Sequence, residues 1–270
     1  MILCFSGTGN SLYIAKLLAD SLNDNVTELK DEFLLDSGQA TISCKNEVRV
    51  VWVFPVYSWG IPPVVKRYMN RVNLRNAGGV GHYMVATCGD DAGLTHRQWR
   101  KLIKRRHWTD IGAYSVIMPN TYTLMKGFDI DTSEVAARKL ADAPSTVKSI
   151  AADISDQSIV DKVKTGNWAW IKSRIIYPWF VRHAMSPKPF HATDVCTGCG
   201  LCAKACPLEN VMMWKHRPEW RDRCALCLRC YHICPNHAVA YGKSTEQKGQ
   251  YLCPEISVKE FVATEPSDRQ

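Results

Sequence analysis

Eight of the twelve cysteines in this 270-residue chain lie between Cys196 and Cys234, and they repeat one spacing. The first run is Cys196, Cys199, Cys202 and Cys206 followed by Pro207, and the second is Cys224, Cys227, Cys230 and Cys234 followed by Pro235. The shared pattern, C-x2-C-x2-C-x3-C-P, indicates an internal duplication. Clustering of this kind predicts metal sites rather than the disulfide framework of a small secreted domain.

The spacing within each run bears on which metal is held. Zinc ribbons and fingers use pairs of ligands separated by a longer loop, so that four ligands close a tetrahedron. Three cysteines at successive three-residue steps suit the corners of an iron–sulfur cubane better. Zinc, or a disulfide knot, is the alternative that the spacing alone leaves open.

The segment 191–241 resembles the bacterial ferredoxins that carry two [4Fe–4S] clusters, in which the fourth cysteine of each run ligates the other cluster. The resemblance implies a crossed arrangement. One cluster would be held by Cys196, Cys199, Cys202 and Cys234, and the other by Cys206, Cys224, Cys227 and Cys230. The proline after each fourth cysteine favours extended backbone there and turns the chain away from its own run.

The N-terminal part alternates hydrophobic strands with amphipathic helices, which is typical of a parallel sheet covered on both faces. We expect strands at 2–5, 26–29, 48–54, 83–87 and 113–118. Helices are expected at 10–22, 63–72, 94–107 and 133–154, the last with a break at Pro144. The prediction is an α/β domain with a doubly wound five-stranded parallel sheet, whose ligand site lies at the carboxyl ends of the strands.

The loop after the first predicted strand has the composition of an anion cradle: Ser6, Gly7, Thr8, Gly9, Asn10 and Ser11. Glycines let backbone N–H groups turn inward, hydroxyls donate to phosphate oxygens, and the following helix contributes its positive end. The loop lacks the dinucleotide fingerprint G-x-G-x-x-G and the NTPase pattern G-x-x-x-x-G-K-[ST]. An ordinary tight connection is the alternative.

Two further loops leave the same predicted edge of the sheet. The second consists of Pro55, Val56, Tyr57, Ser58, Trp59 and Gly60, and the third of Thr87, Cys88, Gly89 and Asp90. Tyr57 and Trp59 suit stacking on a flat ring, although Trp59 could instead pack against the cysteine-rich module. Cys88 is expected to be a small neighbour of that ring and not a nucleophile, and residues 119–122 are expected to lie at the same edge.

The first loop resembles the phosphate loop of flavodoxins, [ST]-x-T-G-x-[ST], and almost the whole chain resembles the flavodoxin–ferredoxin fusion proteins of anaerobes. This resemblance implies a flavodoxin-like fold with non-covalently bound FMN, followed by a small α+β two-cluster ferredoxin domain. The expected boundaries are 1–156 for the FMN domain, 157–189 for an aromatic connector, 190–245 for the ferredoxin domain and 246–270 for a tail.

Charge and aromatic patterning suggest where partners bind. The formal net charge of +8 is offset by about six negative charges once clusters and FMN are bound. The basic run 97–106 and the basic spacer 207–223 fit an acidic redox partner, whereas nucleic-acid binding is not expected because apolar residues in the first run recur at helical spacing. The connector 168–180 fits either a membrane-surface helix or, since Pro178 interrupts it, a packed connector. No apolar stretch is long enough to cross a bilayer and no secretory signal is visible, so we expect a cytoplasmic protein.

Three functions remain open on the sequence. The first is an electron-transfer protein moving single electrons between the clusters and FMN, linking a low-potential donor to an acceptor. The second is an FMN-dependent reductase of a quinone or flavin, fed by the clusters. The third is a ferredoxin-like carrier or redox sensor whose flavodoxin-like part is structural. No catalytic acid–base residue can be named.

Overall fold

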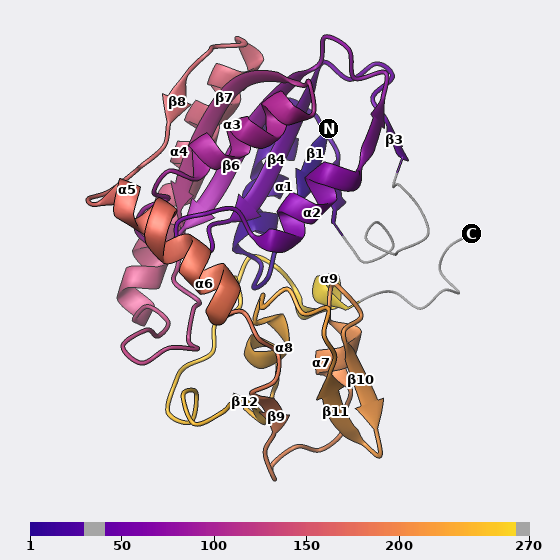
Figure 1. The fold of residues 1–270 in the computed structure, drawn as a ribbon, viewed down its shortest axis with the longest axis vertical. Coiled ribbons are helices and arrows are strands. Elements are labelled where there is room, and N and C mark those ends of the chain that lie inside the picture. The colour runs from indigo at the N-terminus through magenta and orange to yellow at the C-terminus, as the bar shows by residue number, and fades with distance from the viewer. Residues whose placement is uncertain (30–40, 263–270) are drawn as a thin grey trace. The chain divides into compact units, whose positions relative to one another are not determined.

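The computed structural model describes residues 1–29 and 41–262, and its chain divides into two compact units (Figure 1). The first unit comprises Met1–Ser6, Asn10–Asn120 and Asp131–Met185. The second comprises Gly7–Gly9, Thr121–Ile130 and Ser186–Gln270, of which 263–270, the end of the expected tail, lie outside the described residues. Each unit is described by itself below.

The first unit is built on a six-stranded parallel sheet in the order β2-β1-β4-β6-β7-β8. Its strands are β1 (Ile2–Cys4), β2 (Val26–Glu28), β4 (Arg49–Pro55), β6 (Gly81–Cys88), β7 (Thr109–Ile117) and β8 (Asp161–Lys162). Over its first five strands this is the flavodoxin-like order 2-1-3-4-5, in which strand order reverses between the first and third strands. The predicted flavodoxin-like α/β fold is confirmed.

Helices cover both faces of this sheet, and their positions follow from the apolar residues in their sequences. The helices are α1 (Asn10–Leu22), α2 (Pro63–Arg71), α3 (Thr95–Arg105) and α4 (Ser133–Ser155). Helix α1 packs with α4 on one face, and α2 packs with α3 on the other. The central strand β6 is buried along its entire length, as expected of a parallel strand covered on both sides.

Two details of the first unit differ from the sequence-based expectation. Strand β8 is a sixth strand, formed by two exposed charged residues whose pairing with β7 carries no hydrophobic pattern. A separate parallel pair, β3 (Thr41–Ser43) and β5 (Asn73–Arg75), was also not expected. Short exposed strands of this kind are set by backbone pairing, which leaves little trace in side-chain type.

Helix α4 continues through Pro144, where a break was predicted. Pro144 removes one backbone hydrogen bond, but its ring faces solvent while Ala143, Val147 and Ile150 are buried on the opposite side. Packing on both sides of the proline therefore keeps the helix whole.

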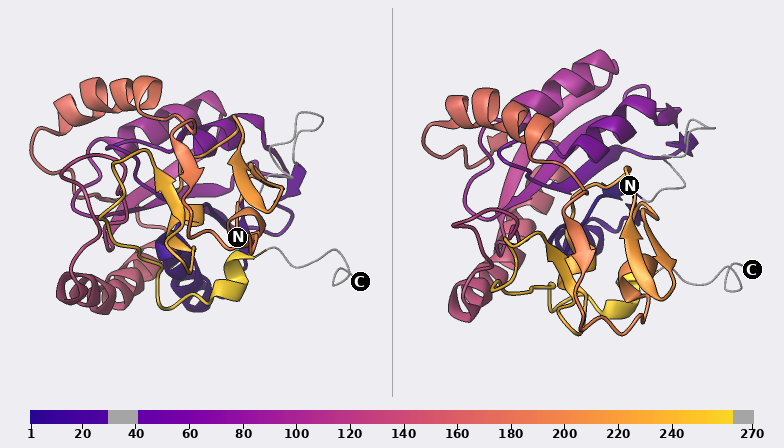
Figure 2. Two further views of the ribbon diagram at one scale, coloured as in Figure 1. Left: turned by 90° about the horizontal axis from the view of Figure 1, so that it is seen from below. Right: turned by 60° about the horizontal axis from the view of Figure 1, so that its bottom comes forward.

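The connector is also one continuous helical rod, made of α5 (Ala169–Ile171), the π-helical turn η2 (Lys172–Ile176) and α6 (Tyr177–His183), as Figure 2 shows from two sides. The expectation that Pro178 interrupts it is wrong. The wider π turn lies directly before Pro178, where a helix must accommodate a residue without a backbone N–H.

The second unit is small and mixes short helices with short strands. It contains β9 (Phe190–Ala192), α7 (Leu201–Lys204), β10 (Val211–Trp214), β11 (Arg217–Trp220), α8 (Arg229–His232), β12 (Val239–Tyr241) and α9 (Val258–Phe261). Strand β9 pairs antiparallel with β12, and β10 pairs antiparallel with β11.

The duplication seen in the sequence is also present in the backbone of this unit. Gly198 and Gly200 in the first cysteine run have φ of 70° and 75°, and the equivalent Leu226 and Leu228 in the second run have φ of 53° and 62°. Leucine pays about 1 kcal/mol or more for this left-handed conformation. Both leucines are buried, so packing compensates for the strain.

Candidate redox centres

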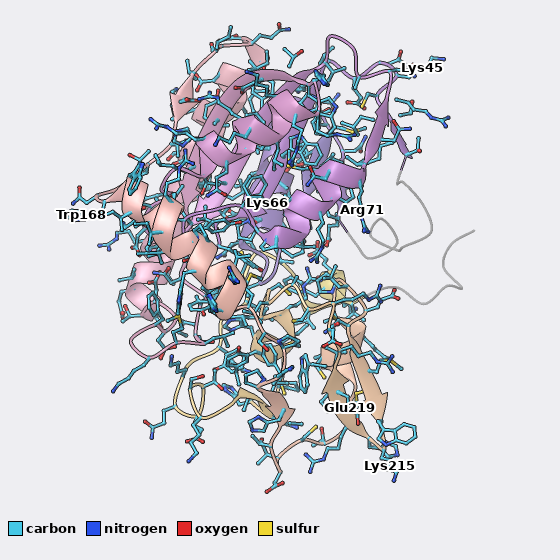
Figure 3. All side chains as sticks on the ribbon, viewed as in Figure 1. Lys45, Lys66, Arg71, Trp168, Lys215 and Glu219 are labelled. Carbon is cyan, nitrogen blue, oxygen red and sulfur yellow. The ribbon has the colours of Figure 1, made fainter. Side chains whose placement is uncertain are left out.

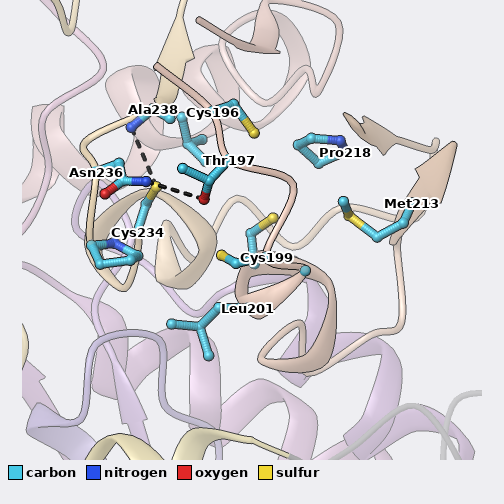
Figure 4. Close-up of a pocket in the computed structure, with 13 residues that line it drawn as sticks. Cys196, Thr197, Cys199, Leu201, Met213, Pro218, Cys234, Asn236 and Ala238 are labelled. Carbon is cyan, nitrogen blue, oxygen red and sulfur yellow. Dashed lines mark hydrogen bonds between the residues drawn. The ribbon is translucent and has the colours of Figure 1, made fainter. Parts of the chain in front are cut away.

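Four cysteine side chains from both runs line one cavity of the second unit (Figure 4). They are Cys196, Cys199, Cys202 and Cys234, the set that the ferredoxin resemblance assigns to the first cluster. The Sγ of Cys234 accepts a hydrogen bond from the backbone N–H of Ala238 at 3.2 Å. The remaining wall is mostly apolar and includes Met213 and Pro218.

The other four cysteines line a second cavity in the same unit. They are Cys206, Cys224, Cys227 and Cys230, with Phe190, Val211 and Trp220 among the apolar residues around them. Three N–H groups donate to these sulfurs at 3.3 Å: Asn210 to Cys206, Leu226 to Cys224, and the Trp220 indole to Cys230. The fold thus gathers the cysteines in the crossed sets and not by run.

The electrostatics of both cavities favour a bound cationic centre. Burial, with the neighbouring cysteines, raises the pKa of Cys202 to about 11 and that of Cys224 to about 12, and the pKa of Cys230 is raised well above its usual value. Thiolates so enclosed need a positive counter-charge, which iron supplies. All twelve cysteines lie in the described part of the chain, and there each of them is free of a disulfide. Four sulfurs around one apolar space, with N–H donors to the thiolates, fit a [4Fe–4S] cluster.

The phosphate-loop candidate is buried, and its side chains are held in place at the end of β1. Ser6, Thr8 and Ser11 are each at most 5% exposed. The Ser11 and Thr87 hydroxyls lie 2.8 Å apart, which joins the first predicted loop to the third. Asn10 donates to the carbonyl of Pro119 at 2.9 Å. The first and third loops and residue 119 therefore meet at one edge, as predicted.

The second loop is a tight two-residue turn with a strained backbone. Tyr57 and Gly60 exchange two backbone hydrogen bonds of 2.9 Å, and between them Ser58 and Trp59 have φ of 44° and 62°. Two consecutive non-glycine residues in the left-handed region are costly, and such strain is concentrated at functional sites.

The connector helix holds this turn in place within the first unit. Buried Ser173 donates to the carbonyl of Trp59 at 2.8 Å and accepts from the N–H of Leu94 at 2.7 Å. The Tyr177 hydroxyl donates to the carbonyl of Ile61, and its ring lies against Gly60, where a Cβ would meet it at 2.4 Å. Sequence reasoning missed this role, because Ser173 and Tyr177 carry no motif.

The third loop is packed closely. Burial, helped by Asp91, raises the pKa of Cys88 to about 12. The side chain of Asn120 occupies the space in which a Cβ of residue 89 would stand, so only glycine fits there. Asn120 is held by two 3.0 Å hydrogen bonds to Asp131, which pairs with Lys139 at 2.6 Å. Burial raises the pKa of Asp131, but these hydrogen bonds outweigh it and hold the pKa below its usual value.

Arg229, which the sequence did not single out, contacts both residues 7–9 of the first loop, called the glycine loop below, and the second cysteine set. All of these belong to the second unit. It is 3% exposed and donates to the carbonyls of Gly7 at 2.9 Å and Ala205 at 3.2 Å. Gly7 lies against the backbone of Cys227, so that a Cβ would meet its carbonyl oxygen at 2.4 Å. Cys253 donates from its backbone to the carbonyl of Thr8. Residues 7–9 are therefore adjacent to the second cysteine set within the second unit.

Comparison with known protein families supports the cluster sites. Two models, both described as 4Fe-4S binding domains, match residues 187–208 and 221–242. A search of curated proteins found no match.

Three solved structures that are similar to this chain have low identity to it. A flavodoxin from Streptococcus pneumonia TIGR4 is 13% identical, covering 58% of this chain and 97% of its own, with a TM-score of 0.37. An FMN-dependent NADH-azoreductase from Bacillus anthracis is 12% identical, covering 56% and 97%, with a TM-score of 0.34. A WrbA-like flavodoxin from Agrobacterium tumefaciens is 12% identical, covering 58% and 97%, with a TM-score of 0.33. The strand order of the sheet by itself gives the flavodoxin-like fold class.

The matched cluster domains and the flavodoxin-like strand order define the class of protein. They are consistent with a flavodoxin–ferredoxin fusion: the two matched models support [4Fe–4S] clusters in the second unit, and the strand order gives the first unit a flavodoxin-like fold. In the described residues, no helix is long and apolar enough to cross a membrane.

Proposed function

We propose that this protein transfers electrons between two [4Fe–4S] clusters and an FMN, linking a low-potential donor to an acceptor. Residues 6–11, 55–60 and 87–90 hold the flavin, and the two crossed cysteine sets hold the clusters. The flavin exchanges one or two electrons and each cluster exchanges one, so the pair can convert between the two modes.

The contact between the glycine loop and the second cysteine set is the observation that carries this proposal. Gly7 touches the backbone of Cys227, and Arg229, two residues further on, donates to the Gly7 carbonyl. A phosphate bound at this loop would lie beside the cluster held by Cys206, Cys224, Cys227 and Cys230. Electrons then enter or leave the flavin through this cluster, and the cluster of the first set lies further along the route.

The first set is suited to face the external partner. Cys199 in the first set is exposed, whereas each cysteine of the second set is buried or partly buried. A redox partner, acidic if the basic spacer 207–223 contributes, would dock on this side of the second unit.

Anaerobic reconstitution of the full chain with iron, sulfide and FMN tests the cofactor content. We expect about eight iron atoms, from two cubanes, and one flavin for each chain. A chain that takes up clusters but cannot be loaded with FMN would favour the ferredoxin-like carrier with a structural flavodoxin-like unit.

Serine substitutions test the crossed ligation. Cys206→Ser and Cys230→Ser are expected to alter the same EPR signal, and Cys196→Ser and Cys234→Ser the other one. Cys253→Ser serves as the control, because Cys253 is buried but lines neither cavity. If Cys206→Ser altered the signal that Cys196→Ser alters, each cluster would be held by a single run.

A further inference from the structure

The connector rod presents an exposed aromatic face that its packing in the first unit does not use. Trp168 is 75% exposed, Trp170 61%, Ile175 55% and Trp179 53%. Trp168, labelled in Figure 3, projects outward at the start of α5. Large apolar side chains of a folded protein are seldom exposed together in this way without a binding role.

The same helix buries its opposite face, so the exposed aromatics are not a sign of poor packing. Ser173, Tyr177 and Phe180 are each at most 6% exposed and recur at the spacing of one helix face. Trp168, Ile171, Ile175 and Trp179 recur at three- and four-residue steps on the other side. The rod is therefore fixed to its unit along one side and offers an apolar stripe along the other.

The chain segment that carries this stripe has charges of one sign. No acidic residue occurs between Asp161 and Asp194 in the sequence, whereas six basic residues do. They are Lys162, Lys164, Lys172, Arg174, Arg182 and Lys188. Lys172 is paired with Asp91 at 2.7 Å, but Arg174 and Arg182 are exposed on the rod itself.

We propose that residues 168–183 bind the surface of an anionic lipid bilayer. Tryptophan is the side chain that best occupies the boundary between headgroups and acyl chains, and isoleucine adds apolar area just below it. Arginine attracts anionic headgroups, and the missing acidic residues remove the repulsion. The rod lies along the surface, with Ser173 and Tyr177 holding the first unit behind it. Membrane binding is an addition to the proposed electron-transfer function. It would bring an electron carrier to a lipid-dissolved or membrane-bound partner.

Sedimentation of the full, cofactor-loaded chain with vesicles tests this proposal. We expect binding to phosphatidylcholine vesicles that contain phosphatidylglycerol, little binding to phosphatidylcholine alone, and weaker binding as salt rises. Arg174→Gln with Arg182→Gln should weaken binding about fivefold for each arginine. Trp168→Ser with Trp179→Ser should weaken it at least tenfold and reduce the quenching of tryptophan fluorescence by brominated lipids.

Two control variants remove the same types of side chain at positions outside the rod, and so test whether position matters. Lys101→Gln with Lys104→Gln removes two exposed charges from α3, and Trp214→Ser removes a 62% exposed indole from the second unit. Neither should change vesicle binding. The proposal is overturned if the control variants weaken binding as much as the rod variants do, or if the wild-type chain does not bind anionic vesicles. It is also overturned if analytical ultracentrifugation shows a wild-type dimer that the tryptophan variant converts to a monomer. The stripe would then bind a second copy of this chain.

Discussion

At the scale of single residues, buried Arg229 joins Gly7 to the second cysteine set within the second unit. Its guanidinium is buried, stacks over the ring of Phe261 at 5.0 Å, and donates to carbonyls beside the glycine loop and beside Cys206. A permanent positive charge this close to a cluster stabilises the reduced form, which is more negative than the oxidised form.

Arg229→Gln is therefore expected to lower the midpoint potential of one cluster and leave the other unchanged. Potentiometric titration followed by EPR measures both. Arg229→Lys keeps the charge and should recover most of the shift, while Arg221→Gln, at an exposed position of the same unit, should shift neither potential. Equal potentials in wild type and Arg229→Gln would remove this residue from the tuning of the cluster.

At the scale of elements, two prolines that were expected to interrupt helices do not interrupt them. Pro144 and Pro178 both lie inside helices that continue past them. At Pro178 the π turn absorbs the missing hydrogen bond, and at Pro144 the buried face of α4 outweighs it. A proline in a sequence is thus a local cost that tertiary packing can exceed.

Pro144→Ala is expected to stabilise the protein by about 1–3 kcal/mol, because an exposed proline inside a helix is replaced by the best helix former. Urea unfolding followed by far-UV circular dichroism measures the change. Lys148→Ala, at another exposed position of α4, should change stability by less than about 0.5 kcal/mol. An unchanged midpoint for Pro144→Ala would mean that the helix does break there.

At the scale of the whole molecule, each unit contains a buried histidine whose pKa is strongly lowered, His82 in the first unit and His232 in the second. His82 accepts from the Trp52 indole at 3.0 Å and stacks on Trp108, and His232 accepts from the N–H of Tyr251 at 3.1 Å and bonds to the carbonyl of Thr121. Burial lowers the pKa of each to about 4. Since the unfolded chain protonates near pH 6.5, both histidines stabilise the fold above that pH and lose this contribution as the pH falls toward 4.

Protonation of His82 alone should accordingly lower the free energy of unfolding of the first unit by about 2 kcal/mol between pH 7 and pH 5. His82→Gln, which keeps an acceptor for the Trp52 indole, is expected to unfold with a shallower pH dependence than wild type in urea titrations at the two pH values. His191→Gln, at an exposed position, should retain the wild-type pH dependence. A variant slope equal to the wild-type slope would show that His82 is protonated alike in both states.

How far the sequence predicted the sites depended on how each residue acts. The eight cysteines could be identified from the sequence because a cubane requires closely spaced thiolates. The glycine loop could be identified because phosphate binding requires small residues with free N–H groups. Ser173, Tyr177 and Arg229 could not be identified from the sequence. Each acts through a carbonyl, a close packing contact or a buried charge supplied by a segment far away in the chain.

By itself, the sequence determined the two halves of this protein and their chemistry: a doubly wound α/β unit, then a duplicated cysteine module. Those are consequences of hydrophobic period, turn residues and ligand spacing, which are local along the chain. Only the tertiary structure decided the remainder. The crossed cavities, the contact of Gly7 with Cys227, the connector helix through Pro178 and its exposed tryptophans all follow from which distant segments pack together. That choice depends on shape complementarity and on the backbone hydrogen bonds left to satisfy, neither of which a local pattern records.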